Sequence, residues 1–124
     1  MADYTYTPEN NIFSGMSEKN PEGITVATGQ GELAIGTLLI SLDGADYVIA
    51  DTTDTPTAAD KLSLVVLAET IDATSAAVET IGYRSGSFDV NYLTFGGTDT
   101  YADWKDDARN VNIIFNVGAV NALA

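Results

Sequence analysis

The side chains that could do chemistry in this sequence are its carboxylates, because eighteen of the 124 residues are Asp or Glu and none is His or Cys. Glycosidases hydrolyse their substrates with two such acids. The closely spaced carboxylates are Asp51 and Asp54, and Asp103, Asp106 and Asp107. Lys105 and Arg109 alternate with the second group at helical spacing, which is typical of a solvated helix face. Neither group therefore predicts a catalytic pair.

The missing residue types exclude other chemistry. Without His or Cys the chain cannot form a Ser-His-Asp triad, a Cys-His pair or the common zinc sites. The acidic loops at 43–46 and 51–60 do not follow the EF-hand pattern, and such turns are common for local reasons. Gly29-Gln30-Gly31 with Ala34 matches a dinucleotide motif in letters, but no helix is expected after it. We expect no enzyme activity, no metal and no cofactor.

The charge narrows the range of partners. Eighteen acidic against five basic residues give a net charge of −13, which disfavours binding to nucleic acid or to anionic membranes. The first residues lack the basic and apolar regions of a signal peptide, and no apolar run approaches the roughly 18–20 residues of a membrane span. We expect a soluble protein made in the cytoplasm.

Residues 1–30 are predicted to form an extended arm. Pro, Gly and Asn residues interrupt every apolar stretch of this segment before it becomes long. It is nevertheless rich in side chains that are costly to leave in water: Tyr4, Tyr6, Ile12, Phe13, Met16, Ile24 and Val26. We interpret these side chains as anchors for a partner surface. The alternative is an arm that folds back on its own domain.

Residues 31–124 are predicted to form a mainly β (α+β) domain. The expected elements are a hairpin around Asp43-Gly44, a loop at 51–60, a central strand within 61–71, a bent strand at 77–90, a short helix within 99–110 and a closing strand at 111–117. Asp99 or Thr100 is a suitable cap for the helix, and Tyr101, Trp104, Lys105 and Ala108 share one of its faces.

Several segments occur in an order that resembles the head decoration protein family of lambda-like phages. They are Gly36-Thr37-Leu38-Leu39 after an irregular arm, Leu64–Ala68, the segment Tyr83-Arg84-Ser85-Gly86-Ser87-Phe88 leading to Leu93, a short charged helix, and a closing strand at 112–117. The resemblance covers the chain from Gly36 to about Val120, and none of its segments is a catalytic fingerprint.

The resemblance implies a compact β-rich domain that sits as homotrimers at three-fold and quasi-three-fold positions on the outside of an expanded capsid. In this family the N-terminal arm becomes ordered on the major capsid protein, often by adding a strand, and the protein stabilises the shell against DNA pressure. The implied location is the outer surface of the virion. The arm here is longer than in the smallest members, so the register of its contact with the capsid protein does not follow.

A second hypothesis is a small carbohydrate-binding or adhesive β module. Five aromatic side chains could line a sugar platform: Tyr83, Tyr92, Phe95, Tyr101 and Trp104. The simpler interpretation of these aromatics is core packing, which we favour.

Overall fold

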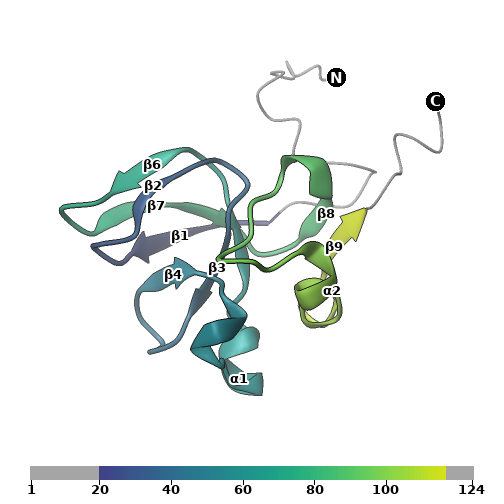
Figure 1. Cartoon of the computed structure of the whole chain (residues 1–124). Coiled ribbons are helices and arrows are strands. Elements are labelled where there is room, and N and C mark those ends of the chain that lie inside the picture. The colour runs from purple at the N-terminus through teal and green to yellow at the C-terminus, as the bar shows by residue number, and fades with distance from the viewer. Residues whose placement is uncertain (1–19, 117–124) are drawn as a thin grey trace, which may run out of the picture.

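The computed structural model describes residues 20–116 and shows a mainly β domain with one longer helix near its C-terminal end, which confirms the predicted fold class (Figure 1). Its strands are β1 (Pro21–Val26), β2 (Gly31–Leu33), β3 (Leu38–Ser41), β4 (Tyr47–Ile49), β5 (Val65–Leu67), β6 (Ile71–Ala73), β7 (Val78–Tyr83), β8 (Gly86–Asp89) and β9 (Ile113–Asn116). Its helices are the single-turn α1 (Ala58–Lys61) and α2 (Tyr101–Arg109), with short 3₁₀ turns at Thr52–Asp54 and Val90–Tyr92.

Five strands form a closed barrel in the order β1-β4-β3-β5-β7. β1 pairs antiparallel with β7 along its whole length, from Pro21 opposite Tyr83 to Val26 opposite Val78. On its other side β1 meets β4 through a single parallel pair, Val26 with Tyr47, which closes the barrel. Two smaller sheets, β2-β6 and the parallel pair β8-β9, complete the fold.

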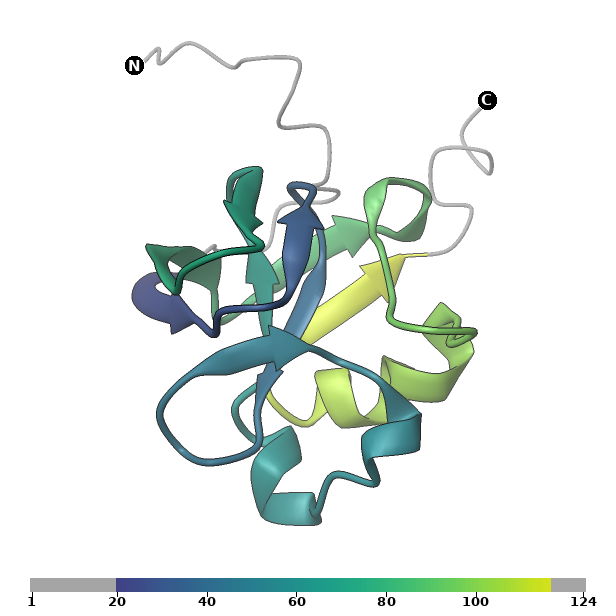
Figure 2. The ribbon, with the colours of Figure 1, turned by 60° about the vertical axis from the view of Figure 1, so that its left-hand side comes forward.

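β3 and β5 lie between two hydrophobic cores. Because side chains alternate along a strand, Leu39 and Val65 pack with β1 and the β2-β6 sheet, while Leu38 and Val66 pack with α2 and the β8-β9 sheet. Every residue of β5 is buried, as expected for a central strand covered on both faces. The core that contains Leu38, Val66 and Trp104 joins the C-terminal elements to the barrel. Figure 2 shows α2 and β9 beside the barrel strands.

The boundary expected at residue 30 is wrong, because residues 21–30 belong to the domain. β1 is one of the barrel strands, and its Ile24 and Val26 are only 7% and 0% exposed. These two side chains are core residues and cannot anchor the chain to a partner. Pro21 is tolerated because it is the first residue of its strand. The other proposed anchors, at Tyr4, Tyr6, Ile12, Phe13 and Met16, lie outside the described residues.

The hairpin between β3 and β4 forms around Asp43-Gly44 as predicted, and its loop is longer than these two residues. Ser41 pairs with Tyr47, so the loop comprises residues 42–46. The Asp43 carboxylate accepts hydrogen bonds from the backbone N–H groups of Ala45 and Asp46, at 2.8 and 3.0 Å, and Gly44 adopts a φ of +80°. A side chain thus organises the turn, which explains the acidic loop without a metal.

The C-terminal elements follow the prediction closely. α2 begins after Thr100, whose N–H donates to the Asp103 carboxylate at 2.8 Å. Trp104 and Ala108 are fully buried, whereas Lys105 is exposed, so the buried face of the helix is narrower than expected. The predicted strand at 77–90 is divided into β7 and β8 by a corner at Arg84 and Ser85.

Candidate interaction surface

The segment that carries the family resemblance forms the corner between β7 and β8. The backbone N–H of Arg84 donates to the carbonyl of Asn20 at 2.8 Å, and its guanidinium Nε lies 3.2 Å from Glu22 Oε1. The two bonds hold the start of β1 against the corner. Arg84 therefore fixes the place where the N-terminal segment joins the barrel.

The rest of this segment is structural. Phe88 is fully buried, and the Tyr83 ring lies beside it with centroids 6.2 Å apart. Gly86 is buried with a φ of +138°, a conformation that disfavours any side chain. The side chains of Ser87 and Phe88 belong to β8, at 7% and 0% exposure. Ser85 lies at the corner itself and is half-buried.

Gly36 and Thr37, the other predicted pair, form the turn that enters β3. Gly36 has a φ of +96°, and its N–H donates to the carbonyl of Leu67 at 2.9 Å. The Thr37 hydroxyl is buried and donates to the carbonyl of Ala34 at 2.7 Å. Both residues therefore support the local fold.

Beside that corner lies a shallow depression, here called the Arg84 hollow, with a volume of about 310 Å³. Its lining includes Glu22, Tyr47, Leu62, Arg84, Val111 and Asn112. Burial raises the pKa of the Tyr47 phenol, and the neighbouring Glu22 charge raises it further, so Tyr47 stays neutral. Within the part of the chain that the structure describes, the charged residues lining this hollow are Arg84 and Glu22, which form an ion pair.

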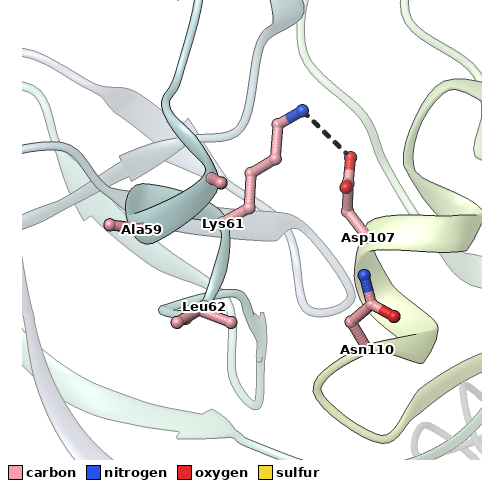
Figure 3. Close-up of a pocket in the computed structure, with 6 residues that line it drawn as sticks. Ala59, Lys61, Leu62, Asp107 and Asn110 are labelled. Atoms are coloured by element: carbon pink, nitrogen blue, oxygen red, sulfur yellow. Dashed lines mark ion pairs between the residues drawn. The ribbon is translucent and has the colours of Figure 1, made fainter.

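A second depression, the α1 hollow, lies between α1 and α2 and has a volume of about 350 Å³ (Figure 3). It is lined by Ala58, Ala59, Lys61, Leu62, Asp107 and Asn110. Lys61 Nζ lies 3.3 Å from Asp107 Oδ2, so this ion pair joins the two helices at the wall of the hollow. Its charged lining residues are again one cation and one anion.

Leu62 forms the ridge between the two hollows, since it lines both. It is 67% exposed, the highest value among the large hydrophobic side chains that are exposed in residues 20–116. This exposure was not predicted, because the apolar run that contains Leu62 was assigned to the buried central strand. The available signal was Thr57-Ala-Ala-Asp60, which resembles a capping box and predicts a helical turn before the strand.

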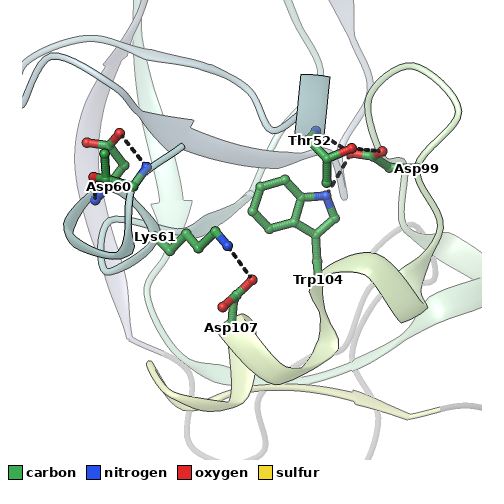
Figure 4. Close-up of polar contacts among 7 residues, drawn as sticks. Thr52, Asp60, Lys61, Asp99, Trp104 and Asp107 are labelled. Atoms are coloured by element: carbon green, nitrogen blue, oxygen red, sulfur yellow. Dashed lines mark hydrogen bonds and ion pairs between the residues drawn. The ribbon is translucent and has the colours of Figure 1, made fainter. Parts of the chain in front are cut away.

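Local hydrogen bonds hold α1 in place. Thr57 Oγ1 accepts from the Asp60 N–H at 3.1 Å, and Asp60 Oδ2 accepts from the Thr57 N–H at 3.0 Å. Upstream, Asp99 accepts from the Thr52 N–H at 2.7 Å and from the Trp104 indole N–H at 2.9 Å (Figure 4). The loop that carries α1 is thus fastened to α2 at two places, by Asp99 and by the Lys61 ion pair.

Two opposing effects set the acidity of Asp99. Desolvation raises its pKa, but the hydrogen bonds from Thr52 and Trp104 favour the ionised form and outweigh that effect. The pKa of Asp99 therefore lies below its ordinary value, and the group is charged at neutral pH.

Three of the carboxylates considered above for catalysis make local contacts. Asp51 accepts from the Thr53 N–H at 2.9 Å, Asp103 caps α2, and Asp107 pairs with Lys61. Within residues 20–116, no group of three or more acidic side chains is arranged to hold a metal ion.

The aromatic side chains are not arranged as the sugar platform would require. Trp104 is fully buried and donates its indole N–H to Asp99. Phe95 packs edge-on against Phe115, with ring centroids 5.5 Å apart. Of the five aromatics, Tyr92 is the one with an exposed side chain, at 51%. The side chain that would contribute most to stacking against a sugar is therefore inside the protein.

No protein-family model matches the chain, and no curated protein matches it significantly. Among the helices of residues 20–116, none combines the length and the apolar character needed to cross a membrane.

Proposed function

We propose that this protein is a capsid decoration protein of a tailed phage. It binds the exterior of the expanded shell as homotrimers at three-fold and quasi-three-fold positions, contacts the major capsid protein, and acts mechanically and not as an enzyme. The observation that carries the proposal is the Tyr83–Phe88 segment, which resembles the family. Within this segment the Arg84 N–H donates to the carbonyl of Asn20, at the point where the N-terminal segment enters the barrel. The mainly β domain with one late helix fits the fold that the resemblance implies.

The energetics favour binding through several weak contacts. In strand addition each backbone hydrogen bond contributes about 0.5–1.5 kcal/mol net, while ordering costs about 1–2 kcal/mol per residue. A single N-terminal segment with Tyr4, Tyr6, Ile12 and Phe13 as anchors therefore binds weakly. Three segments on one trimer raise the effective concentration of the second and third contacts to about the millimolar range.

The test is co-sedimentation with expanded, undecorated shells of the encoding phage. The intact chain is compared with a variant that lacks residues 1–19. Removing residues 1–30 is unsuitable, because it deletes β1 and opens the barrel. We expect the intact chain to saturate the three-fold positions and to raise the melting temperature of the shells, and we expect the truncated chain to bind at least about tenfold more weakly.

Two control measurements, far-UV circular dichroism and a thermal melt, show whether the truncated domain is still folded. Failure of the intact chain to bind shells, or binding without any gain in shell stability, rejects the decoration function. Equal binding by both forms rejects the role of the N-terminal segment alone.

A further inference from the structure

The two hollows and the Leu62 ridge form a face on which the charges are balanced. Among residues 20–116, two cations and two anions line the hollows, paired as Lys61 with Asp107 and Arg84 with Glu22. The chain as a whole carries a net charge of −13. Two copies that approach through acidic surfaces repel each other, whereas this face can meet a second copy without that cost.

The same face combines a projecting apolar side chain, Leu62, with the adjoining α1 hollow. Leu62 projects with 67% of its surface exposed, and the adjoining α1 hollow offers about 350 Å³ beside the exposed Ala58 and Ala59. Burying an exposed leucine side chain against apolar atoms of a second copy favours association. The projecting side chain of one protomer is therefore complementary to the depression on a second copy.

The symmetry of the assembly then fixes how the copies meet. In a closed ring of three, each contact joins two different patches of the neighbouring protomers. On this face the two parts of the contact are the Leu62 side chain and the remainder of the α1 hollow. Because Leu62 also lines the α1 hollow, the face must lie close to the three-fold axis, where each protomer contacts both of its neighbours.

We infer that this face is the contact between protomers: Leu62 of one copy inserts into the α1 hollow of the next, beside Ala58, Ala59 and Asn110. The inference rests on the proposed trimeric decoration function, which it deepens by naming the surface through which the trimer forms. The partner is a second copy of this chain.

The absence of cysteine from the sequence permits a clean cross-linking test. Full-length Leu62→Cys and Asn110→Cys proteins carry tags of different mass and are mixed, free in solution and on expanded shells, under mild oxidation. We expect a disulfide-linked pair that contains one of each variant. Ile81→Cys mixed with Asn110→Cys is the matched control, because Ile81 is also exposed, at 45%, but lies on β7 beside a different depression.

A second pair of variants tests the energetics. Leu62→Glu adds a charge to the balanced face and should weaken association, or cooperative loading of shells, about tenfold or more, whereas Ile81→Glu adds the same charge elsewhere and should not.

Cross-linking of Leu62→Cys only to itself, or no mixed disulfide either free or on shells, overturns the inference. Unlinked protein that still loads shells rejects the face but leaves the decoration function standing. Mixed disulfides in a protein that never binds shells support the face and reject the function.

Discussion

At the scale of single residues, Asp99 is the side chain that joins the loop before α1 to α2. One carboxylate oxygen accepts from both the Thr52 N–H and the buried Trp104 indole, and the other accepts from the Thr52 hydroxyl at 2.6 Å. Hydrogen bonds to a charged acceptor are stronger than neutral ones. The position of α1, and therefore of Leu62, depends on this carboxylate.

Replacing Asp99 by Asn should lower the free energy of unfolding at pH 7 by about 1–2 kcal/mol, because a neutral amide accepts weaker hydrogen bonds from Thr52 and Trp104 than the charged carboxylate does. The pKa of Asp99 is lower in the folded than in the unfolded state. Its contribution is thus present above the unfolded pKa, near 4, and is lost as the pH falls through the folded value. Urea unfolding of both proteins between pH 7 and pH 2.5 should show curves that converge on acidification.

Asp106→Asn is the matched control for this experiment, since Asp106 is an exposed acid on the same helix. Its unfolding curve should follow that of the unmodified protein at every pH. A constant difference between Asp99→Asn and the unmodified protein across the whole range would contradict the role assigned to the Asp99 charge.

At the scale of elements, the barrel depends on close packing of β7 against β5 and β1. A Cβ placed on Gly82 would lie 2.9 Å from Val65 Cγ2 and 3.2 Å from Ile24 Cδ1, closer than carbon atoms tolerate. Gly82 is thus the position at which the sheet curves tightly over its core.

Gly82→Ala should lower the free energy of unfolding by about 1–3 kcal/mol, because the added methyl group overpacks the core between Val65 and Ile24. Gly23→Ala, on the paired strand, is the control: its Cβ would meet no atom within 4 Å. Its stability should be unchanged or slightly higher, because alanine restricts the unfolded chain. Urea denaturation measures both, and equal stability of the two variants would refute the packing argument.

The elements differ in how well the sequence predicts them. α2 and β9 are encoded locally, by a cap, a helical spacing and alternating apolar residues, so the sequence predicts both elements. β9 is shorter than expected, because Val111 lies in the turn before it. β1 was assigned to the arm because Pro21 and Gly23 interrupt it and because its partner, β7, lies some fifty residues later in the chain. A strand stabilised by a distant partner leaves little signal in its own residues.

The candidate interface was not predictable for a related reason. The sequence shows Leu62 at the start of a continuous apolar run, where burial is the natural expectation. Its exposure follows from the turn of α1, and the two ion pairs join residues that are far apart in the chain, Lys61 with Asp107 and Glu22 with Arg84. Such pairs arise from the fold and have no signature in spacing.

At the scale of the whole molecule, the excess of acid shapes both stability and solubility. With eighteen acidic and five basic residues, most carboxylates have no cation to pair with. Some are brought together by the fold: Glu32 of β2 lies opposite Asp72 of β6. Such repulsion destabilises the compact state, but a high net charge keeps many exposed copies from sticking to one another.

Salt should therefore stabilise the free protein. Raising NaCl from about 10 mM to about 0.5 M shortens the range of electrostatic repulsion from about 30 Å to a few ångströms. We expect the melting temperature to rise by about 5 °C, which corresponds to roughly 1 kcal/mol for a domain of this size. Differential scanning calorimetry at pH 7 measures the change. The double variant Glu32→Gln and Glu79→Gln removes two exposed negative charges and should start from a higher melting temperature and respond less to salt. If salt leaves the melting temperature of the unmodified chain unchanged, or affects both proteins equally, repulsion among the carboxylates does not limit the stability of this fold.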